Sequence, residues 1–349
     1  MELQARLERY TPRDPNDDTA HFLEMFFKFL PEDGKYQLAE DVVGCTTDAS
    51  LRQLASSLDT GLLRPIKANG GKTPAIPTPY SSFAVEDSIE EPNPMDFRSI
   101  SRNKLQRLRN ECLSRDGQMC VISKVLNEDL RPPPDSMFGP LETTHIIPFA
   151  LGGFSGEEDR ERLQSSTIWT ILYRYFPSLR SRMNFTLENV HEVENAMMLI
   201  PSLRHEFARF DCTLEATTTI HQYRMKTYRY FATVNNVYLP ANRIVTFTNN
   251  DTRYPLPSPI LIEVHAAIAN ILDATGRGQL VEKILRDQDD DVDFLANDGS
   301  TDIGRILSYT RLILFTQPEE YAPWDMKQPL AEEQTPKGDD ELKESQLAR

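Results

Sequence analysis

Three short segments of this 349-residue chain carry polar side chains in an order that restricts what the chain can fold into. The stretch Thr-Thr-His-Ile-Ile-Pro-Phe contains His145. Some fifty residues later, Glu-Asn-Ala-Met-Met-Leu contains Asn195, and Leu-Arg-His-Glu-Phe contains His205. Together these segments place a histidine, an asparagine and a second histidine in that order along the chain, each beside a short apolar run.

The residue patterns around these segments predict short strands and a helix. Residues 120–123 (Cys-Val-Ile-Ser) and 141–148 are predicted as two strands that pair in a hairpin across a polar, proline-rich connection. Residues 195–200 form a short apolar segment. Residues 202–210 are predicted as a helix capped by Ser202.

Helical patterns dominate the rest of the chain. Apolar residues at three- and four-residue spacing predict helices within 1–65, over 157–187 and over 261–285, the last interrupted near Gly276. β-Branched and aromatic residues predict further strands. These strands are expected at 217–220, 228–231 and 243–247.

Composition indicates that part of the chain does not belong to a packed core. Hydrophobic residues make up 39% of the sequence, and there are 24 prolines. Residues 66–97 combine glycines, prolines and an acidic cluster, which predicts a linker. Residues 287–349 are acidic and rich in proline, which predicts a largely disordered tail because little apolar surface is available to offset the entropy of ordering.

The net charge of −15 is spread unevenly along the chain. Residues 1–97 carry a net charge of −8 and residues 286–349 carry −9, whereas residues 98–285 carry +2. Wholesale coating of nucleic acid requires a basic face, and the acidic total does not favour it. The near-neutral centre is compatible with a local basic groove, and the acidic flanks suggest a protein partner.

Two segments are candidates for contact with phosphate groups. Residues 104–115 predict a basic helix that is either a solvated face or a phosphate contact. Its cations are Lys104, Arg107, Arg109 and Arg115. Residues 223–229 mix bases with aromatic side chains and could lie along a nucleic-acid strand.

Cysteine spacing and the N-terminal sequence favour an intracellular protein. None of the four cysteines forms a Cys-x-x-Cys pair, so a four-thiolate zinc site is not expected. The first residues lack a basic and then apolar secretory signal, and no run of 18 apolar residues predicts a membrane span. We expect residence in the nucleus or cytoplasm, without secretion or membrane association.

A family resemblance adds to this reading of the residues. Residues 115–123, 144–149, 194–199 and 205–207 together resemble the HNH endonuclease domain of fungal proteins. The resemblance covers residues 110–215, about a third of the chain. It implies an α+β fold in which a ββα-metal finger is embedded in a larger, mostly helical domain with flanking helices and a disordered C-terminal tail.

The domain organisation that we expect follows from this resemblance and from the composition. It comprises an N-terminal helical region (1–65), a linker (66–97), an HNH nuclease-like domain (98–250), a C-terminal helix packed on it (251–286) and the acidic tail (287–349).

The resemblance also implies roles for individual residues. His145 would be the general base that activates water, and Asn195 would hold its loop by bridging backbone groups. His205 would bind one divalent metal ion, Mg²⁺ or Mn²⁺ in preference to Zn²⁺. The reaction implied is hydrolysis of phosphodiester bonds in nucleic acid, with DNA as the expected polymer.

One departure from the family pattern bears on the metal. Many HNH nucleases place Asp or His directly before the general base, and this chain has Thr144 there, a poor ligand for Mg²⁺. Asp211 is the substitute ligand that we predict, with Glu206 and His191 as further candidates. The segment between the first His and the Asn is also about twice the usual length of the motif.

Two other functional hypotheses remain open at this stage. In the first, the HNH fold persists without catalysis and serves as a nucleic-acid- or protein-interaction module. In the second, the chain is a structural helical protein and its match to the motif is coincidental. This hypothesis predicts that His145, Asn195 and His205 lie far apart.

Overall fold

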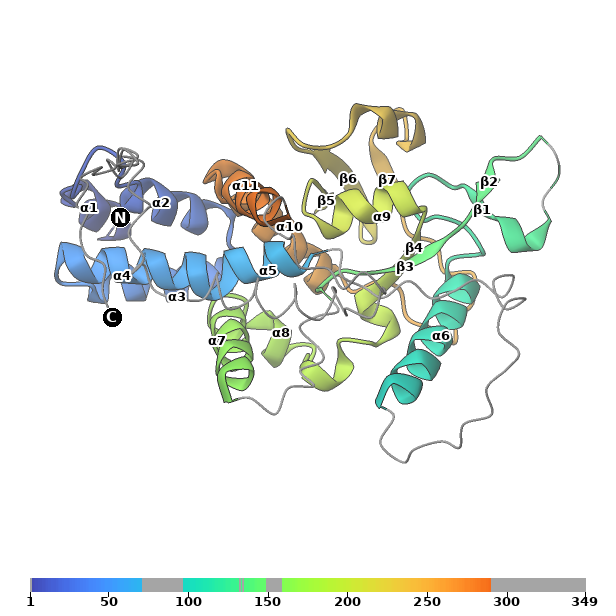
Figure 1. Cartoon of the computed structure of the whole chain (residues 1–349), viewed down its shortest axis with the longest axis horizontal. Coiled ribbons are helices and arrows are strands. Elements are labelled where there is room, and N and C mark those ends of the chain that lie inside the picture. The colour runs from blue at the N-terminus through green and yellow to red at the C-terminus, as the bar shows by residue number, and fades with distance from the viewer. Residues whose placement is uncertain (1, 71–96, 132, 134, 149–158, 290–349) are drawn as a thin grey trace, which may run out of the picture. The chain divides into compact units, whose positions relative to one another are not determined.

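The computed structural model describes residues 2–70, 97–131, 133, 135–148 and 159–289. These residues form a mixed α+β architecture in which small sheets lie among helices (Figure 1). Most of the predicted acidic tail and most of the predicted linker lie outside the described residues, and residues 287–289 of the predicted tail belong to the last described helix. Within the described part of the chain, no helix is both long enough and apolar enough to cross a membrane.

The N-terminal region is helical, as the sequence predicts. Phe22, Leu23 and Phe26 lie on one face of the second helix and are fully buried. The fourth helix begins at a capping box formed by Thr47 and Ser50. The helices are α1 (Glu2–Glu8), α2 (Thr19–Phe29), α3 (Glu32–Gly44), α4 (Asp48–Leu58) and α5 (Arg64–Asn69), with a π-helical turn between the last two (Asp59–Leu63).

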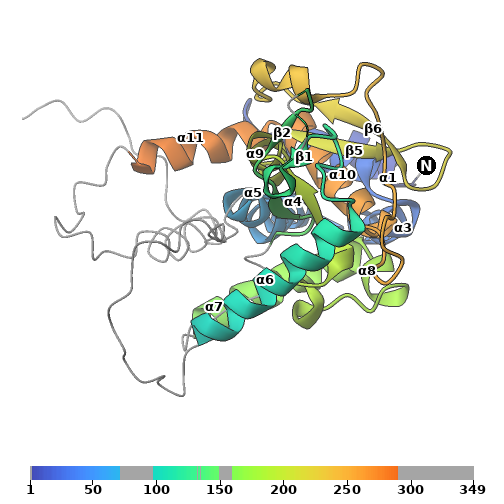
Figure 2. The same cartoon turned by 90° about the vertical axis from the view of Figure 1, so that its right-hand side faces the viewer.

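A pair of strands and two helices occupy the centre of the region that contains the sequence motif. These elements are α6 (Phe97–Arg115), β3 (Glu142–His145), β4 (Ala196–Leu199) and α9 (Pro201–Ala208). β3 and β4 are antiparallel, and His145 pairs with Ala196. α9 follows β4 and packs against β3, while α6 contacts both strands (Figures 1 and 2). All four residues of β4 are therefore buried.

A three-stranded antiparallel sheet lies on the other side of α9. Helix α10 packs against β5 and against α2, which joins this sheet to the N-terminal helices. The remaining elements are β1 (Leu126–Asn127), β2 (Phe138–Gly139), α7 (Asp159–Tyr175), α8 (Ser178–Ser181), β5 (Cys212–Ala216), β6 (Gln222–Thr227), β7 (Ile244–Thr246), α10 (Pro259–Ala274) and α11 (Arg277–Asp289).

The predicted hairpin between residues 120–123 and 141–148 is wrong. Residues 121–123 form a turn, which Lys124 closes with a positive φ and a hydrogen bond from its N–H to the Cys120 carbonyl (3.0 Å). The Val121 N–H instead donates to the Met198 carbonyl of β4 (3.0 Å). β4 is the partner of β3, so the strand pair is closed by residues some fifty positions apart.

Three smaller predictions also need correction. α9 begins at Pro201 after Ile200 and has no side-chain cap, because proline is itself favoured at a first helical position. Residues 217–220 lie between β5 and β6, and residues 228–231 follow β6, so neither segment is a strand. The strand predicted at 243–247 does contain β7.

A buried histidine joins α9, β5 and α10. His265 stacks on Phe207 and Phe210 at centroid distances of 3.8 and 4.5 Å. Its ring nitrogens make hydrogen bonds to the Thr213 hydroxyl (2.9 Å) and the Phe207 carbonyl (3.1 Å). Burial lowers the pKa of His265 to about 3, so the folded protein keeps this ring neutral.

This neutral ring makes stability depend on pH. The unfolded chain binds a proton at His265 below its ordinary pKa of about 6.5, and the folded chain does not until about pH 3. We expect the free energy of unfolding to decrease as the pH is lowered from about 6.5 to about 3, by about 1.4 kcal/mol per pH unit for this residue. Urea titrations at several pH values give the slope of the unfolding free energy against pH. In His265→Phe this slope should be smaller than in the wild-type protein by the equivalent of about one proton.

The matched control for this measurement is His21→Gln, which changes an exposed histidine. Equal pH slopes in His265→Phe and the wild-type protein would contradict the assignment.

Candidate functional site

His145 and His191 form the centre of the candidate site. His145 ends β3 and is only 4% exposed. The Nδ1 atom of His191 lies 3.5 Å from the Nε2 atom of His145, and the two rings are nearly perpendicular at 86°. His191 is half-buried, so solvent reaches the pair at His191.

Asn195 fixes the backbone that follows His145. Its side chain is fully buried and accepts a hydrogen bond from the Ile147 N–H (2.8 Å). It donates to the Ile147 carbonyl (3.1 Å) and to the Val190 carbonyl (2.8 Å). One amide thereby ties the segment after His145 to the segment before His191, which is the bridging geometry that the sequence predicts.

Arg115 holds the backbone on both sides of Asn195. Its fully buried guanidinium donates to the carbonyls of Val193 (2.7 Å) and Ala196 (2.8 Å) and to the Pro255 carbonyl (3.2 Å). The same group donates twice to Asp116, at 2.7 and 3.0 Å. All five of its N–H donors are therefore in use, and its earlier interpretation as a phosphate contact is wrong.

Electrostatics keep both histidines neutral. The pKa of His145 is lowered to about 3, mainly by burial and then by the charges of His191 and Arg204. Burial and the charge of Lys104 lower the pKa of His191. At neutral pH both rings are uncharged, so each has one nitrogen able to accept a proton or a hydrogen bond.

Thr144 lies in β3 directly before His145 and is only 1% exposed. Its hydroxyl oxygen has no hydrogen-bond partner within the described residues. Burying a hydroxyl without a hydrogen-bond partner costs free energy. A polar group that reached this hydroxyl would therefore be stabilised by a hydrogen bond to it.

His205 does not face the His145 site. It is exposed, and its ring lies 3.5 Å from the guanidinium of Arg209, one turn further along α9. Arg204 faces β3 instead and forms an ion pair of 3.1 Å with Glu142. The buried pair Leu203 and Phe207 already indicates this outcome, because it places His205 on the opposite side of the helix.

The predicted substitute ligands lie elsewhere, apart from His191. Asp211 is buried between Lys67 and Arg209, at 3.2 Å from each. Glu282 of α11 pairs with the same two cations, so these four side chains tie α5 and α11 to the turn between α9 and β5. Glu206 is buried and accepts hydrogen bonds from Ala232 and Asn235, and burial raises its pKa.

The described residues around His145 do not fit a tightly held divalent ion. Within the described ranges, His, Cys, Asp and Glu nowhere form a group of three or more with metal-binding geometry. His145 has a second imidazole beside it, but Thr144 is a weak ligand. The charge of Arg204 also acts on His145, and a cation at this position opposes the binding of another.

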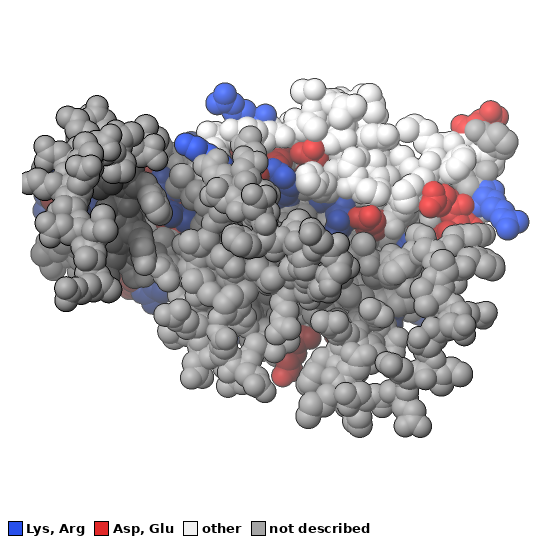
Figure 3. Space-filling view, in the orientation of Figure 1, with Lys and Arg blue, Asp and Glu red and all other residues white. Residues whose placement is uncertain are grey.

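Of the four cations in residues 104–115, Lys104 and Arg107 remain accessible. Both are exposed, whereas Arg109 and Arg115 are buried. On the described part of the face in Figure 3, basic and acidic side chains are interspersed, and neither sign forms a continuous patch. The described residues on this face therefore offer a polyanion no continuous basic surface.

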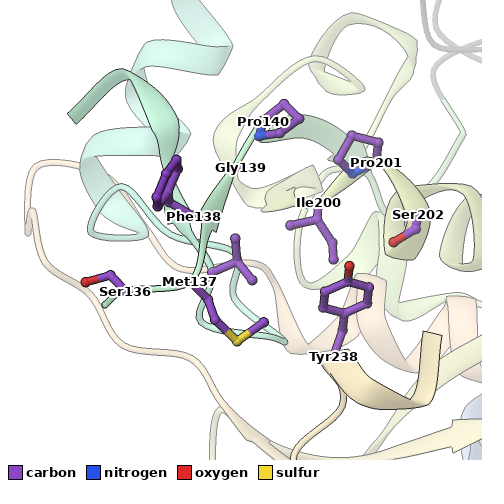
Figure 4. Close-up of a pocket in the computed structure, with 10 residues that line it drawn as sticks. Ser136, Met137, Phe138, Gly139, Pro140, Ile200, Pro201, Ser202 and Tyr238 are labelled. Atoms are coloured by element: carbon purple, nitrogen blue, oxygen red, sulfur yellow. The ribbon is translucent and has the colours of Figure 1, made fainter. Parts of the chain in front are cut away.

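An apolar hollow of about 510 Å³ lies where β3 begins and β4 ends (Figure 4). Met137, Phe138 and Tyr238 line it together with the turn at Ile200 and Pro201. His145 and Asn195 are not among its lining residues. The hollow is therefore separate from the histidine pair.

Comparison with known proteins gives one match. The family model described as HNH endonuclease matches residues 120–215. No curated protein and no solved structure showed significant similarity to the chain. The matched region contains β3, β4 and α9, together with His145, His191 and Asn195.

The contacts of Asn195 lead to a prediction about stability. Asn195→Asp keeps the shape and the acceptor but removes both donors, leaving the Ile147 and Val190 carbonyls without these partners. We expect a loss of roughly 2–4 kcal/mol in the free energy of unfolding, measured by urea denaturation. Asn236→Ala is the control, because Asn236 is exposed. Equal losses in the two variants would contradict the role assigned to Asn195.

Proposed function

Because the chain carries an HNH endonuclease domain in residues 120–215, we propose that it acts on nucleic acid, with DNA as the polymer. The phosphate backbone would meet the protein at the His145–His191 pair, bordered by Lys104 and Arg107 of α6. The observation that carries this proposal is the histidine pair inside the region matched by the family, held by Asn195 and flanked by cations.

Of the functions open to such a site, binding without metal-dependent hydrolysis is the one that the geometry supports best. Thr144 replaces an acid, His205 faces away, and Asp211 belongs to a buried ion network. A general base is most effective when its pKa lies near the working pH, and the pKa of His145 is about 3. These features support the interpretation of the domain as a nuclease-type binding module.

A metal-dependent endonuclease is the second candidate. It is favoured by the backbone bridge of Asn195, which holds His145 as the HNH motif requires. A bound Mg²⁺ or Mn²⁺ would supply charge neutralisation at the phosphate and at the departing oxygen. In this candidate, His145 would accept the proton of the attacking water at Nε2. The carboxylates of Glu157 and Glu158 follow the motif but lie outside the described residues.

The two candidates differ in their response to metal. For the binding module, we expect a duplex DNA oligonucleotide to bind in EDTA, with affinity that falls as salt rises and without cleavage in Mg²⁺ or Mn²⁺. Replacing both Lys104 and Arg107 by alanine should lower the slope of log affinity against log salt by about 1 to 2. Fluorescence anisotropy measures binding, and plasmid nicking measures cleavage.

Arg13→Ala serves as the control for the charge variants, since Arg13 is an exposed arginine of the N-terminal region. Nicking that requires Mg²⁺ or Mn²⁺ and disappears in a folded His145→Gln variant would favour the endonuclease. Absence of DNA binding at low salt would contradict both candidates. The protein partner expected for the acidic flanks stays a prediction.

A further inference from the structure

We propose that the apolar hollow beside β2 binds residues 303–315 of the same chain, which lie outside the described residues. The occupant is therefore a tethered segment of this protein, and neither nucleic acid nor a second copy. Because the hollow is separate from the histidine pair, this binding does not depend on the proposed function.

Apolar side chains around the hollow remain in contact with water among the described residues. Met137 and Phe138 line the hollow and are 61% and 52% exposed (Figure 4). The 3₁₀ segment Thr233–Tyr238 lines the hollow with its last residue and also exposes Val234 and Val237. Single apolar side chains are common on protein surfaces, whereas several around one hollow indicate a surface that another apolar group covers.

Apolar content distinguishes residues 303–315 from the rest of the C-terminal sequence. Eight of these thirteen residues are apolar and none is acidic, whereas the other 47 residues of 290–349 include 14 Asp or Glu. The apolar residues at 303, 306, 307, 313 and 314 recur at spacings of three, four and seven, which predicts a helix with one apolar face. An apolar groove binds such a face when it recognises a helix.

The size and the charge of the hollow also suit this segment. One buried leucine fills roughly 150 Å³, so a hollow of about 510 Å³ accepts several side chains of a helix. Residues 128–136 beside the hollow carry three exposed carboxylates and one arginine, and Asp129 also pairs with Arg109. The charged residues of 303–315 are Arg305 and Arg311, so the segment and the rim of the hollow attract each other.

The connection from α11 is long enough for this binding. The last residue of α11 is Asp289, so 13 residues separate it from Ile303. Thirteen extended residues span up to about 45 Å, which is on the order of the diameter of a domain of this size. A tether of this length gives an effective concentration of about millimolar, which favours the segment over a second copy in dilute solution.

Photocrosslinking in the full chain tests the inference directly. The photoreactive residue p-benzoylphenylalanine replaces Phe138, whose exposed side chain can change without disturbing the fold. Mass spectrometry then identifies the crosslinked peptides in a mixture of ¹⁴N- and ¹⁵N-labelled protein. We expect the main crosslink to join position 138 to residues 303–315 within one isotope label. Leu307→Glu combined with Leu314→Glu should lower its yield about tenfold or more, because charges replace two apolar contacts.

Two controls define the specificity of this crosslink. Leu330→Glu combined with Leu342→Glu makes the same change outside the segment and should leave the yield unchanged. The photoreactive residue at Tyr36, which is exposed on α3, should give no crosslink to residues 303–315. Crosslinks that join two isotope labels would assign the hollow to a second copy and overturn the inference. The absence of any crosslink, a main crosslink elsewhere, or equal yields in the two double variants would also overturn it.

Discussion

A fully buried arginine fixes the strand on which the candidate site is built. Removing a guanidinium from water is very costly, and Arg115 offsets that cost with hydrogen bonds from all five of its donors. Asp116 supplies the opposite charge and also accepts the Met198 N–H of β4 (2.9 Å). Removing one partner of such a pair costs roughly 3–5 kcal/mol, so α6 and β4 are held together as one body.

The contacts of Arg115 also determine the geometry of the candidate site. Arg115 binds the carbonyls on either side of Asn195, and Asn195 in turn binds the segments next to His145 and His191. The contacts that hold these two segments are thus made between protein groups. A scaffold of this kind can keep its shape while a residue that would hold a metal changes, as at Thr144.

The sequence predicts the parts of this site that local patterns determine. Asn195 directly precedes a short apolar run, so its bridging contacts follow from the motif in which it stands. The orientation of His205 was harder to predict, because one position along a helix turns a side chain by about 100°. The burial of Arg115 has no local signal, since arginine is normally exposed. The pairing of β3 with β4 depends on tertiary contacts between distant residues, which neither strand's own sequence specifies.

The central proposal is that the His145 site binds nucleic acid without holding a divalent ion. A crystal structure of the protein with a short duplex, grown in Mn²⁺ and measured with anomalous scattering, tests it directly. The account predicts a phosphate group near His191 and Lys104 and no manganese peak beside His145. A manganese ion coordinated by His145 would contradict it.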